Sequence, residues 1–353
     1  MRIAITADVH LTNMEIHPER YNALENILTK ISQENIDTLI IAGDLFDETY
    51  NNYSEFDKLA SRYSHINFHI IPGNHDALID NKAITSSNVE IYSVPTVKNL
   101  DESGLKFFFL PYQKDSVMGE VIASNMKELH SNKWVLIGHG DWESGMKVSN
   151  PLEPGVYMPL SQKDINSFKP ANVFLGHIHK PLDDVTVCYP GSPCGLDITE
   201  TGKRRFIVFN TENCGIEHHH VDTDIIYFSE IISILPLEDE EIYLRDRIRG
   251  IIKSWDLNEE QKTRVKLRVK VRGYSSNIRK LNEIASEEFK DFRFYNGENI
   301  DLSEVFLSEN YELEEIARKT AERINELKLP SGTYQPTNDE ILFHALKIIY
   351  GGK

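Results

Sequence analysis

The sequence has few cysteines, no long apolar run and no excess of basic charge. Its three cysteines, none in a CxxC spacing, disfavour a disulfide framework or a structural zinc knuckle. No run approaches the roughly 18 apolar residues of a membrane helix, and the N-terminal MRIAITADVH lacks the apolar core of a secretion signal. The net charge of −17 excludes a uniformly basic coat for nucleic acid but not a local basic patch. We therefore expect a cytoplasmic protein with no membrane contact.

The first two hundred residues alternate between strand and helix patterns. Short β-branched runs that are apolar on both faces are typical of buried strands. Apolar residues at helix spacing follow Pro18, and a second helix is expected at Val117–His130. This alternation predicts a layered α/β domain with its functional residues at the carboxyl ends of the strands. The expected strands are Ile3–Thr6, Thr38–Ala42, Phe68–Ile71, Lys106–Leu110, Trp134–Ile137, Val173–Leu175, Arg205–Asn210 and Ile216–Val221.

The chain changes character near Pro236. Between Glu241 and Lys280, twelve lysines and arginines stand against five acidic residues, although the whole chain is acidic. Val265–Val271 alternates apolar and basic residues, which predicts a strand with one buried and one solvated face, and a helix is expected at Ser276–Phe289. With 353 residues, more than one folding unit is expected. We predict a first domain at 1–228, a smaller α/β domain at 229–308 and C-terminal helices at 309–353.

The C-terminal segment has two amphipathic stripes, at 313–327 and 341–349. They predict two helices, with residues 330–336 as a linker between them and Asp339 as the cap of the second helix. Packing on their own chain is one interpretation of these stripes. Docking of a partner protein is the other.

Polar residues with metal-binding side chains follow five of the predicted strands. On a strand, side chains two residues apart point the same way, so both residues of a DxH or HxH pair can share one ion. Carboxylate, imidazole and amide together suit a divalent transition metal rather than magnesium or calcium. Each motif alone is more often a turn or a cap, but five in order predict a metal centre, and seven ligands divide naturally between two ions. The motifs are Asp8-Val-His10, Gly43-Asp44-Leu-Phe-Asp47, Gly73-Asn74-His75-Asp76, Gly138-His139 and Gly176-His177-Ile-His179.

This order of motifs resembles the calcineurin-like metallophosphoesterase superfamily over roughly residues 1–225. GDLFD at 43–47, GHIHKP at 176–181 and YPGSP at 189–193 resemble its DNA-repair exonuclease branch, the SbcD-type nuclease subunits. The resemblance implies an α/β two-sheet sandwich flanked by helices, a smaller α/β capping domain and two divalent metal ions, most often Mn²⁺. It also implies DNA as substrate, an SMC-like ATPase of the SbcC type as partner, and a homodimer.

The resemblance further assigns roles to single residues. His75 resembles the family's catalytic histidine and Asp47 the carboxylate that orients it, while Asp76 is expected to hold the turn. Seven metal ligands are implied in two sets that share one carboxylate: Asp8, His10 and His179 on the first ion, Asn74, His139 and His177 on the second, and Asp44 on both.

The leading hypothesis is a manganese-dependent DNA exo/endonuclease that hydrolyses phosphodiesters with a hydroxide activated by two metals. One alternative uses the same site on small phosphodiesters or cyclic nucleotides, because substrate choice depends on loops and the second domain. Another is an assembly factor whose metal site is vestigial. The basic strand, with Lys266, Arg268 and Lys270, has two interpretations: a phosphate-backbone contact surface or an ordinary solvated sheet face.

Overall fold

The computed structural model describes residues 1–48, 50–82, 84–129, 133–143, 155–237, 239–308, 313–327 and 337–351. The predicted linker at 330–336 lies outside these residues. The chain divides into two compact units, one of Met1–Leu196 with Lys203–Asp224 and one of Asp197–Gly202 with Ile225–Lys353. None of the helices in the described part of the chain combines the length and apolar character that a membrane span requires.

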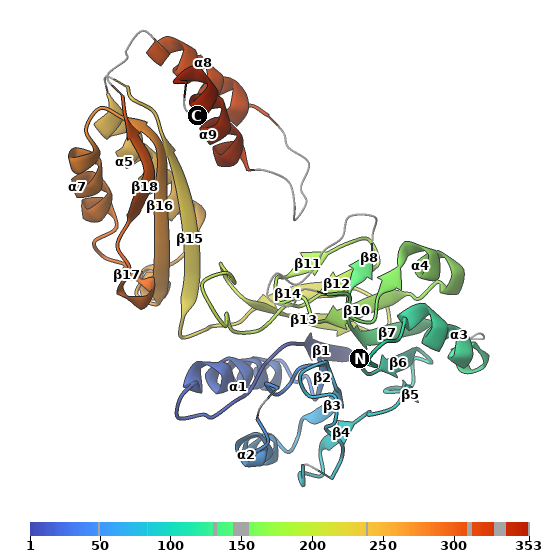
Figure 1. The fold of residues 1–353 in the computed structure, drawn as a ribbon. Coiled ribbons are helices and arrows are strands. Elements are labelled where there is room, and N and C mark those ends of the chain that lie inside the picture. The colour runs from blue at the N-terminus through green and yellow to red at the C-terminus, as the bar shows by residue number, and fades with distance from the viewer. Residues whose placement is uncertain are drawn as a thin grey trace. The chain divides into compact units, whose positions relative to one another are not determined.

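The first unit contains two six-stranded sheets (Figure 1). In the first sheet, β1, β2, β3 and β4 run parallel and β13 and β14 continue it antiparallel. Its strands, in spatial order, are β14 (Ile216–His220), β13 (Arg205–Asn210), β1 (Arg2–Thr6), β2 (Thr38–Ala42), β3 (Asn67–Ile71) and β4 (Val89–Ile91). The second sheet has β11 (Leu182–Asp183), β12 (Val187–Tyr189), β10 (Asn172–Gly176), β7 (Trp134–His139), β6 (Lys106–Leu110) and β5 (Thr96–Asn99).

The two sheets pack face to face, and helices cover their outer faces. Alternate side chains of β1 point to opposite faces of its sheet. Ile3 and Ile5 lie in the core between the two sheets, while Ala4 lies in the core between the sheet and its helices. α1 (Pro18–Gln33) and α2 (Ser54–Arg62) cover the first sheet, and α3 (Met118–Leu129) and α4 (Gln162–Phe168) the second. A short pair, β8 (Trp142–Glu143) with β9 (Leu160–Ser161), lies beside the second sheet. The predicted α/β sandwich flanked by helices is therefore confirmed.

The second unit is built on a parallel four-stranded sheet with β16 paired to all three other strands. The residues of β16 from Val265 to Val271 alternate between buried and partly exposed, which confirms the half-buried strand predicted from the sequence. The sheet consists of β15 (Ile226–Ile234), β16 (Val265–Ser275), β17 (Arg293–Phe294) and β18 (Asp301–Leu307). Apart from its C-terminal segment, this unit has α5 (Glu240–Ser254), α6 (Glu259–Lys262), α7 (Ile278–Glu288) and the short 3-10 turn η1 (Tyr295–Gly297).

Two helices end the described chain, α8 (Glu314–Asn325) and α9 (Asn338–Ile349), and both bury one face in the second unit. The predicted capping role of Asp339 is wrong. Thr337 is the N-cap and exchanges capping-box hydrogen bonds with Glu340, because the chain turns into the helix two residues earlier than expected. Asp339 instead accepts two hydrogen bonds from the Arg247 guanidinium, at 2.9 Å each.

Candidate metal centre

The predicted site residues lie where parallel strands of the two sheets end. Asp8 and His10 follow β1, Asp44 follows β2, Asn74 and His75 follow β3, His139 ends β7, and His177 and His179 follow β10. Four of them have a left-handed backbone, with φ of 53° at Asp8, 50° at His10, 51° at Asp44 and 98° at His177. Such conformations cost roughly 1–3 kcal/mol each in residues other than glycine. Backbone strain is therefore concentrated where the side chains converge.

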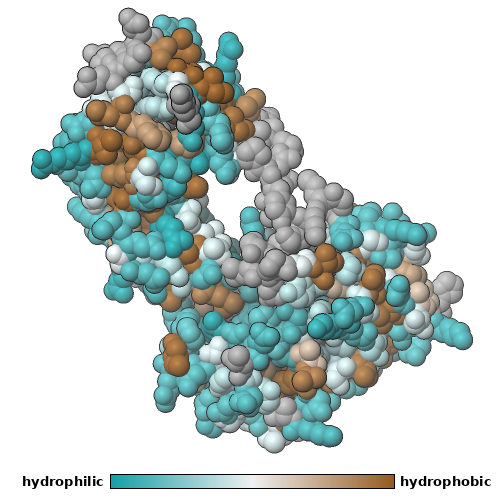
Figure 2. Space-filling model, in the orientation of Figure 1, coloured by the Kyte–Doolittle hydropathy of each residue, from teal (hydrophilic) through white to brown (hydrophobic). Residues whose placement is uncertain are grey.

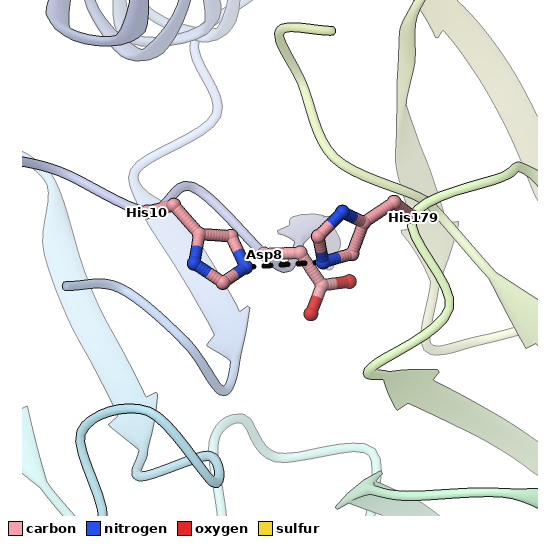
Figure 3. A group of neighbouring side chains, drawn as sticks. All are labelled: Asp8, His10 and His179. Carbon is pink, nitrogen blue, oxygen red and sulfur yellow. Dashed lines mark hydrogen bonds between the residues drawn. The ribbon is translucent and has the colours of Figure 1, made fainter. Parts of the chain in front are cut away.

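Asp8, His10 and His179 point toward one another from opposite sheets (Figure 3). The Nε2 atoms of His10 and His179 are 3.1 Å apart. Asp8 is fully buried, and its Oδ2 has no hydrogen-bond partner. A buried carboxylate oxygen without a partner is costly unless a cation is bound there. The structure thus brings together the three residues of the predicted first ligand set.

The structure also brings together the predicted second set, Asn74, His139 and His177. Asn74 Oδ1 lies 2.9 Å from His139 Nε2 and 3.2 Å from His177 Nδ1. His139 Nδ1 is 3.0 Å from the Ala42 carbonyl, which can only accept, so this nitrogen bears the proton. The Nε2 lone pair of His139 is therefore free to face the site.

Asp44 lies between the two sets and is fully buried, and its Oδ2 has no hydrogen-bond partner. Its Oδ1 accepts the His75 backbone N–H at 2.9 Å, while Oδ2 is 3.3 Å from His139 Nε2 and 3.7 Å from His10 Nε2. Thus one oxygen of Asp44 faces a ligand from each set. This position suits a carboxylate that bridges two ions.

The spacing of these atoms fits metal coordination. Two ligands bound to one ion at about 2.0–2.2 Å are separated by roughly 3.0–3.5 Å. The separations within the sets, 3.1 Å between His10 and His179 and 2.9–3.2 Å around Asn74, lie in this range or about 0.1 Å below it. Together with the buried Asp8 oxygen, they show that the residues present fit two divalent ions.

Electrostatics in the site favour positive charge. Burial raises the pKa of Asp8 to about 6 and lowers the pKa of His10 to about 3. Burial would lower the pKa of His139, but the Asp44 carboxylate outweighs it and raises that pKa to about 9. A buried group of carboxylates thus attracts a proton to His139, at a position where a bound cation would compete with it.

Close packing explains two glycines of the motifs. A Cβ on Gly73 would lie 2.1 Å from Asp44 Oδ1, and a Cβ on Gly176 would lie 2.1 Å from the Ala42 carbonyl oxygen. Real Cβ atoms do not approach other atoms so closely. A larger residue at either position would displace Asp44 or the strand end that holds His139.

His75 and Asp47 lie beside the ligand sets and form a pair. His75 Nδ1 is 3.2 Å from Asp47 Oδ1, and because a carboxylate only accepts, this contact places the proton on Nδ1. The hydrogen bond with His75, supported by Arg20, holds the pKa of Asp47 well below its usual range. Asp76 accepts the backbone N–H groups of Gly73 and Phe46, as expected for a residue that holds the turn.

The sequence analysis did not identify two arginines that hydrogen-bond to the backbone and side chains of the site residues. Arg20 on α1 donates to the His10 carbonyl oxygen and to Asp47 Oδ2, the latter at 3.1 Å. Arg204 is buried and donates to the carbonyl oxygens of His179 and Ser192. Neither arginine belongs to a recognisable motif, and α1 shows only an apolar periodicity, so no sequence pattern pointed to them.

The three predicted DNA-contact residues lie on β16, in the second unit. Arg268 forms two hydrogen bonds with Glu298, at 2.7 and 2.9 Å, and lies over the Tyr295 ring. Lys270 pairs with Glu304 at 2.9 Å. No ion pair involves Lys266 within the described residues. Two of the three cations are thus neutralised by their own chain, and the DNA-contact role stays a prediction.

A two-sheet sandwich with metal-binding side chains at its strand ends defines a class of metal-dependent phosphoesterases. A family model described as calcineurin-like phosphoesterase matches residues 1–181, which is more than half of the chain. The chain belongs to this family, and the predicted superfamily is confirmed. It is therefore a hydrolase of the metallophosphoesterase type.

Two curated relatives are both named as the D component of the nuclease SbcCD. The chain is 27% identical over 250 residues to that of Staphylococcus epidermidis, covering 60% of this chain and 67% of the relative. It is 25% identical over 241 residues to that of Staphylococcus saprophyticus, covering 57% and 63%. The chain thus spans about two thirds of the length of these relatives. A solved dimetal phosphatase from Danio rerio is 10% identical, with a TM-score of 0.42 over 62% of this chain and 95% of the other. The two curated names agree with the nuclease branch that the motifs predict.

Proposed function

We propose that this protein is a manganese-dependent DNA exo/endonuclease that acts in the cytoplasm as the nuclease subunit of an SMC-like ATPase–nuclease complex. The observation that carries the proposal is the position of Asp44 Oδ2, which faces His139 of one ligand set and His10 of the other. The names of the two staphylococcal relatives supply the substrate class and the SbcC-type partner. The chemistry of the ligands, with imidazole, carboxylate and amide, favours Mn²⁺ over Mg²⁺.

When bound, two such ions neutralise a phosphodiester and lower the pKa of a water molecule. The residues of the chain then have separate tasks. Asp8, Asp44 and the four ligand histidines hold the positive charge, and Asn74 adds a neutral oxygen that leaves the ions electrophilic. His75 acts as the catalytic histidine: Asp47 accepts its Nδ1 proton, and in the doubly protonated form of the ring the Nε2 proton is donated to the leaving oxygen. Arg20 positions Asp47, and through it His75.

The partner is proposed to dock on the C-terminal helices, within the predicted segment 309–353. Both helices bury one face in the second unit but leave large apolar side chains exposed, as Figure 2 shows over this part of the chain. Ile316 on α8 is 53% exposed and Ile348 on α9 is 82% exposed. Exposed apolar residues on amphipathic helices suit a helix-to-helix contact with a coiled coil. The predicted division into domains at 1–228, 229–308 and 309–353, with the second as a cap, and the homodimer belong to the same proposal.

Digestion of end-labelled linear DNA by the purified full chain tests the proposal. The reactions contain Mn²⁺, Mg²⁺ or chelator, with a chromogenic phosphodiester in parallel and the His75→Asn variant as control. Degradation of DNA with Mn²⁺ that is lost in His75→Asn is the expected result, and the label reports the polarity.

Cleavage of the small ester with DNA left intact, even after the ATPase partner and ATP are added, would overturn the nuclease proposal. That outcome would favour the alternative of a phosphodiesterase for small substrates or cyclic nucleotides. No cleavage of either substrate by protein with two bound ions would favour a vestigial site.

A further inference from the structure

A carboxylate that no sequence motif singled out lies behind the second ligand set. Asp141 follows His139 by two residues and is only 3% exposed. Its Oδ1 lies 3.7 Å from Nε2 of His177, on the side of the imidazole away from Asn74. The ring of His177 is therefore placed between the Asn74 amide and the Asp141 carboxylate.

We propose that Asp141 is a positioning residue that selects Nδ1 of His177 as the metal-binding nitrogen. The inference rests on the two-metal centre proposed above but not on DNA as its substrate. A neutral imidazole has one protonated nitrogen, and only the other can bind a metal ion. A carboxylate facing Nε2 favours the proton there and leaves the Nδ1 lone pair directed at the site.

The other histidine of this set shows why a second acceptor is needed. The Ala42 carbonyl holds the Nδ1 proton of His139, so His139 presents Nε2 to the site. His177 presents the opposite nitrogen, Nδ1, so the acceptor behind it has to face Nε2. The Asp141 carboxylate faces Nε2 of His177 from 3.7 Å. The Ala42 backbone carbonyl thus sets the tautomer of His139, and the Asp141 side chain sets that of His177.

The second oxygen of Asp141 is committed to the backbone. Oδ2 accepts the Tyr157 N–H at 2.7 Å, and the Asp141 N–H donates to the Tyr157 carbonyl at 2.8 Å. The Tyr157 ring in turn lies against His177, with 4.5 Å between ring centroids. The carboxyl group is thus fixed from one side: its Tyr157 contact requires an acceptor, while Oδ1 faces His177 Nε2 from 3.7 Å, beyond hydrogen-bond distance.

This requirement makes Asp141→Asn a sharp test. An amide has one acceptor oxygen, and a backbone N–H cannot accept, so the oxygen stays with Tyr157 and the NH₂ group turns to His177. The NH₂ group then favours a lone pair on Nε2 and a proton on Nδ1, which is the tautomer that cannot bind at this position. The variant keeps the size and the Tyr157 contact of the wild-type residue.

Asp184→Asn is the matched control. Asp184 also accepts two N–H donors, the Trp142 indole at 2.9 Å and the Val185 backbone at 2.7 Å, and contacts none of the proposed ligands. Mn²⁺ binding to the full chain is measured by equilibrium dialysis with metal analysis. We expect two ions per wild-type and Asp184→Asn chain, and a roughly 10–100-fold weaker second ion in Asp141→Asn. A second-ion affinity in Asp141→Asn equal to that of the wild type would overturn the proposal.

The tautomer is measured directly by ¹⁵N NMR of the metal-free protein with labelled histidine, using a His177→Gln sample for assignment. A proton on Nε2 in the wild type that moves to Nδ1 in Asp141→Asn is expected, whereas a merely structural role would not move it. A wild-type proton on Nδ1 would overturn the proposal even if the variant does not fold. Failure of the wild type to bind any ion would instead reject the two-metal centre itself.

Discussion

Charged side chains in the metal centre and on the basic strand β16 differ in burial and in pairing. In the centre, Asp8 is completely buried with an oxygen that has no hydrogen-bond partner, on a backbone of positive φ. On β16, Arg268 and Lys270 are partly exposed and paired with Glu298 and Glu304. The first arrangement costs stability unless a ligand completes it, while exposed pairs contribute little either way. A buried polar atom without a hydrogen-bond partner is therefore better evidence of a binding site than a cluster of exposed charged residues.

The largest effect is expected at the carboxylate shared by the two ligand sets. Asp44→Ala removes the Oδ2 atom that faces both sets, so we expect both ions to be lost together with phosphodiester cleavage. Metal analysis of the purified variant measures this. Asp184→Asn is the control, because Asp184 contacts none of the proposed ligands, and it should retain two ions. Two ions per Asp44→Ala chain would refute the bridge.

The next effect separates catalysis from metal binding at neighbouring residues. His75→Asn removes the imidazole that faces a leaving group but leaves Asn74 and the Asp44 contact with the backbone in place. We expect unchanged metal content and a loss of roughly 10²–10⁴ in the rate of cleavage, as for other general acids. The rate on a chromogenic phosphodiester, normalised to bound metal, is the measurement. Normal cleavage with full metal content would remove His75 from the mechanism.

A smaller effect tests the other side of the comparison. If β16 binds DNA, replacing Lys266, Arg268 and Lys270 by Ser should lower the slope of log affinity against log salt by about 0.9 for each phosphate that is no longer neutralised. Binding is measured with chelator to prevent cleavage. Arg245→Ser with Arg249→Ser removes two other paired cations of the same unit and serves as control. An unchanged slope in the β16 variant would leave that strand an ordinary solvated sheet face.

The smallest effect concerns a partly buried imidazole that lies outside the centre and has a hydrogen-bond partner. His69 on β3 is hydrogen-bonded to the Tyr92 hydroxyl at 2.8 Å, and burial lowers its pKa from 6.5 to about 4. Between these values the unfolded chain binds more protons than the folded one, so stability falls as pH falls from about 6.5 to 4. We expect His69→Phe to lose on the order of 2 kcal/mol less over this range than the wild type. Urea unfolding at both pH values, with chelator, measures the difference, and parallel pH profiles would contradict the assignment.

Local patterns sufficed for much of the first unit. The predicted strands Lys106–Leu110 and Arg205–Asn210 coincide with β6 and β13, because continuous apolar runs bounded by turns specify buried strands. The short strands β4 and β5 and the pair β8 with β9 were not predicted. Two to four residues hold too little periodicity, and such strands form only because a neighbouring strand offers its hydrogen bonds.

The sequence by itself determined which residues have ligand chemistry and that they end strands, because both follow from residue type and local pattern. Only the tertiary structure decided which atoms meet. Pairing across the sandwich brings His10 to His179. The packing of α1 on the first sheet places Arg20 behind Asp47, and the pairing of β7 with β10 within the second sheet puts Asp141 behind His177. These contacts join residues between 27 and 169 positions apart. Their geometry depends on the packing of two sheets and a helix, which no local window of the sequence contains.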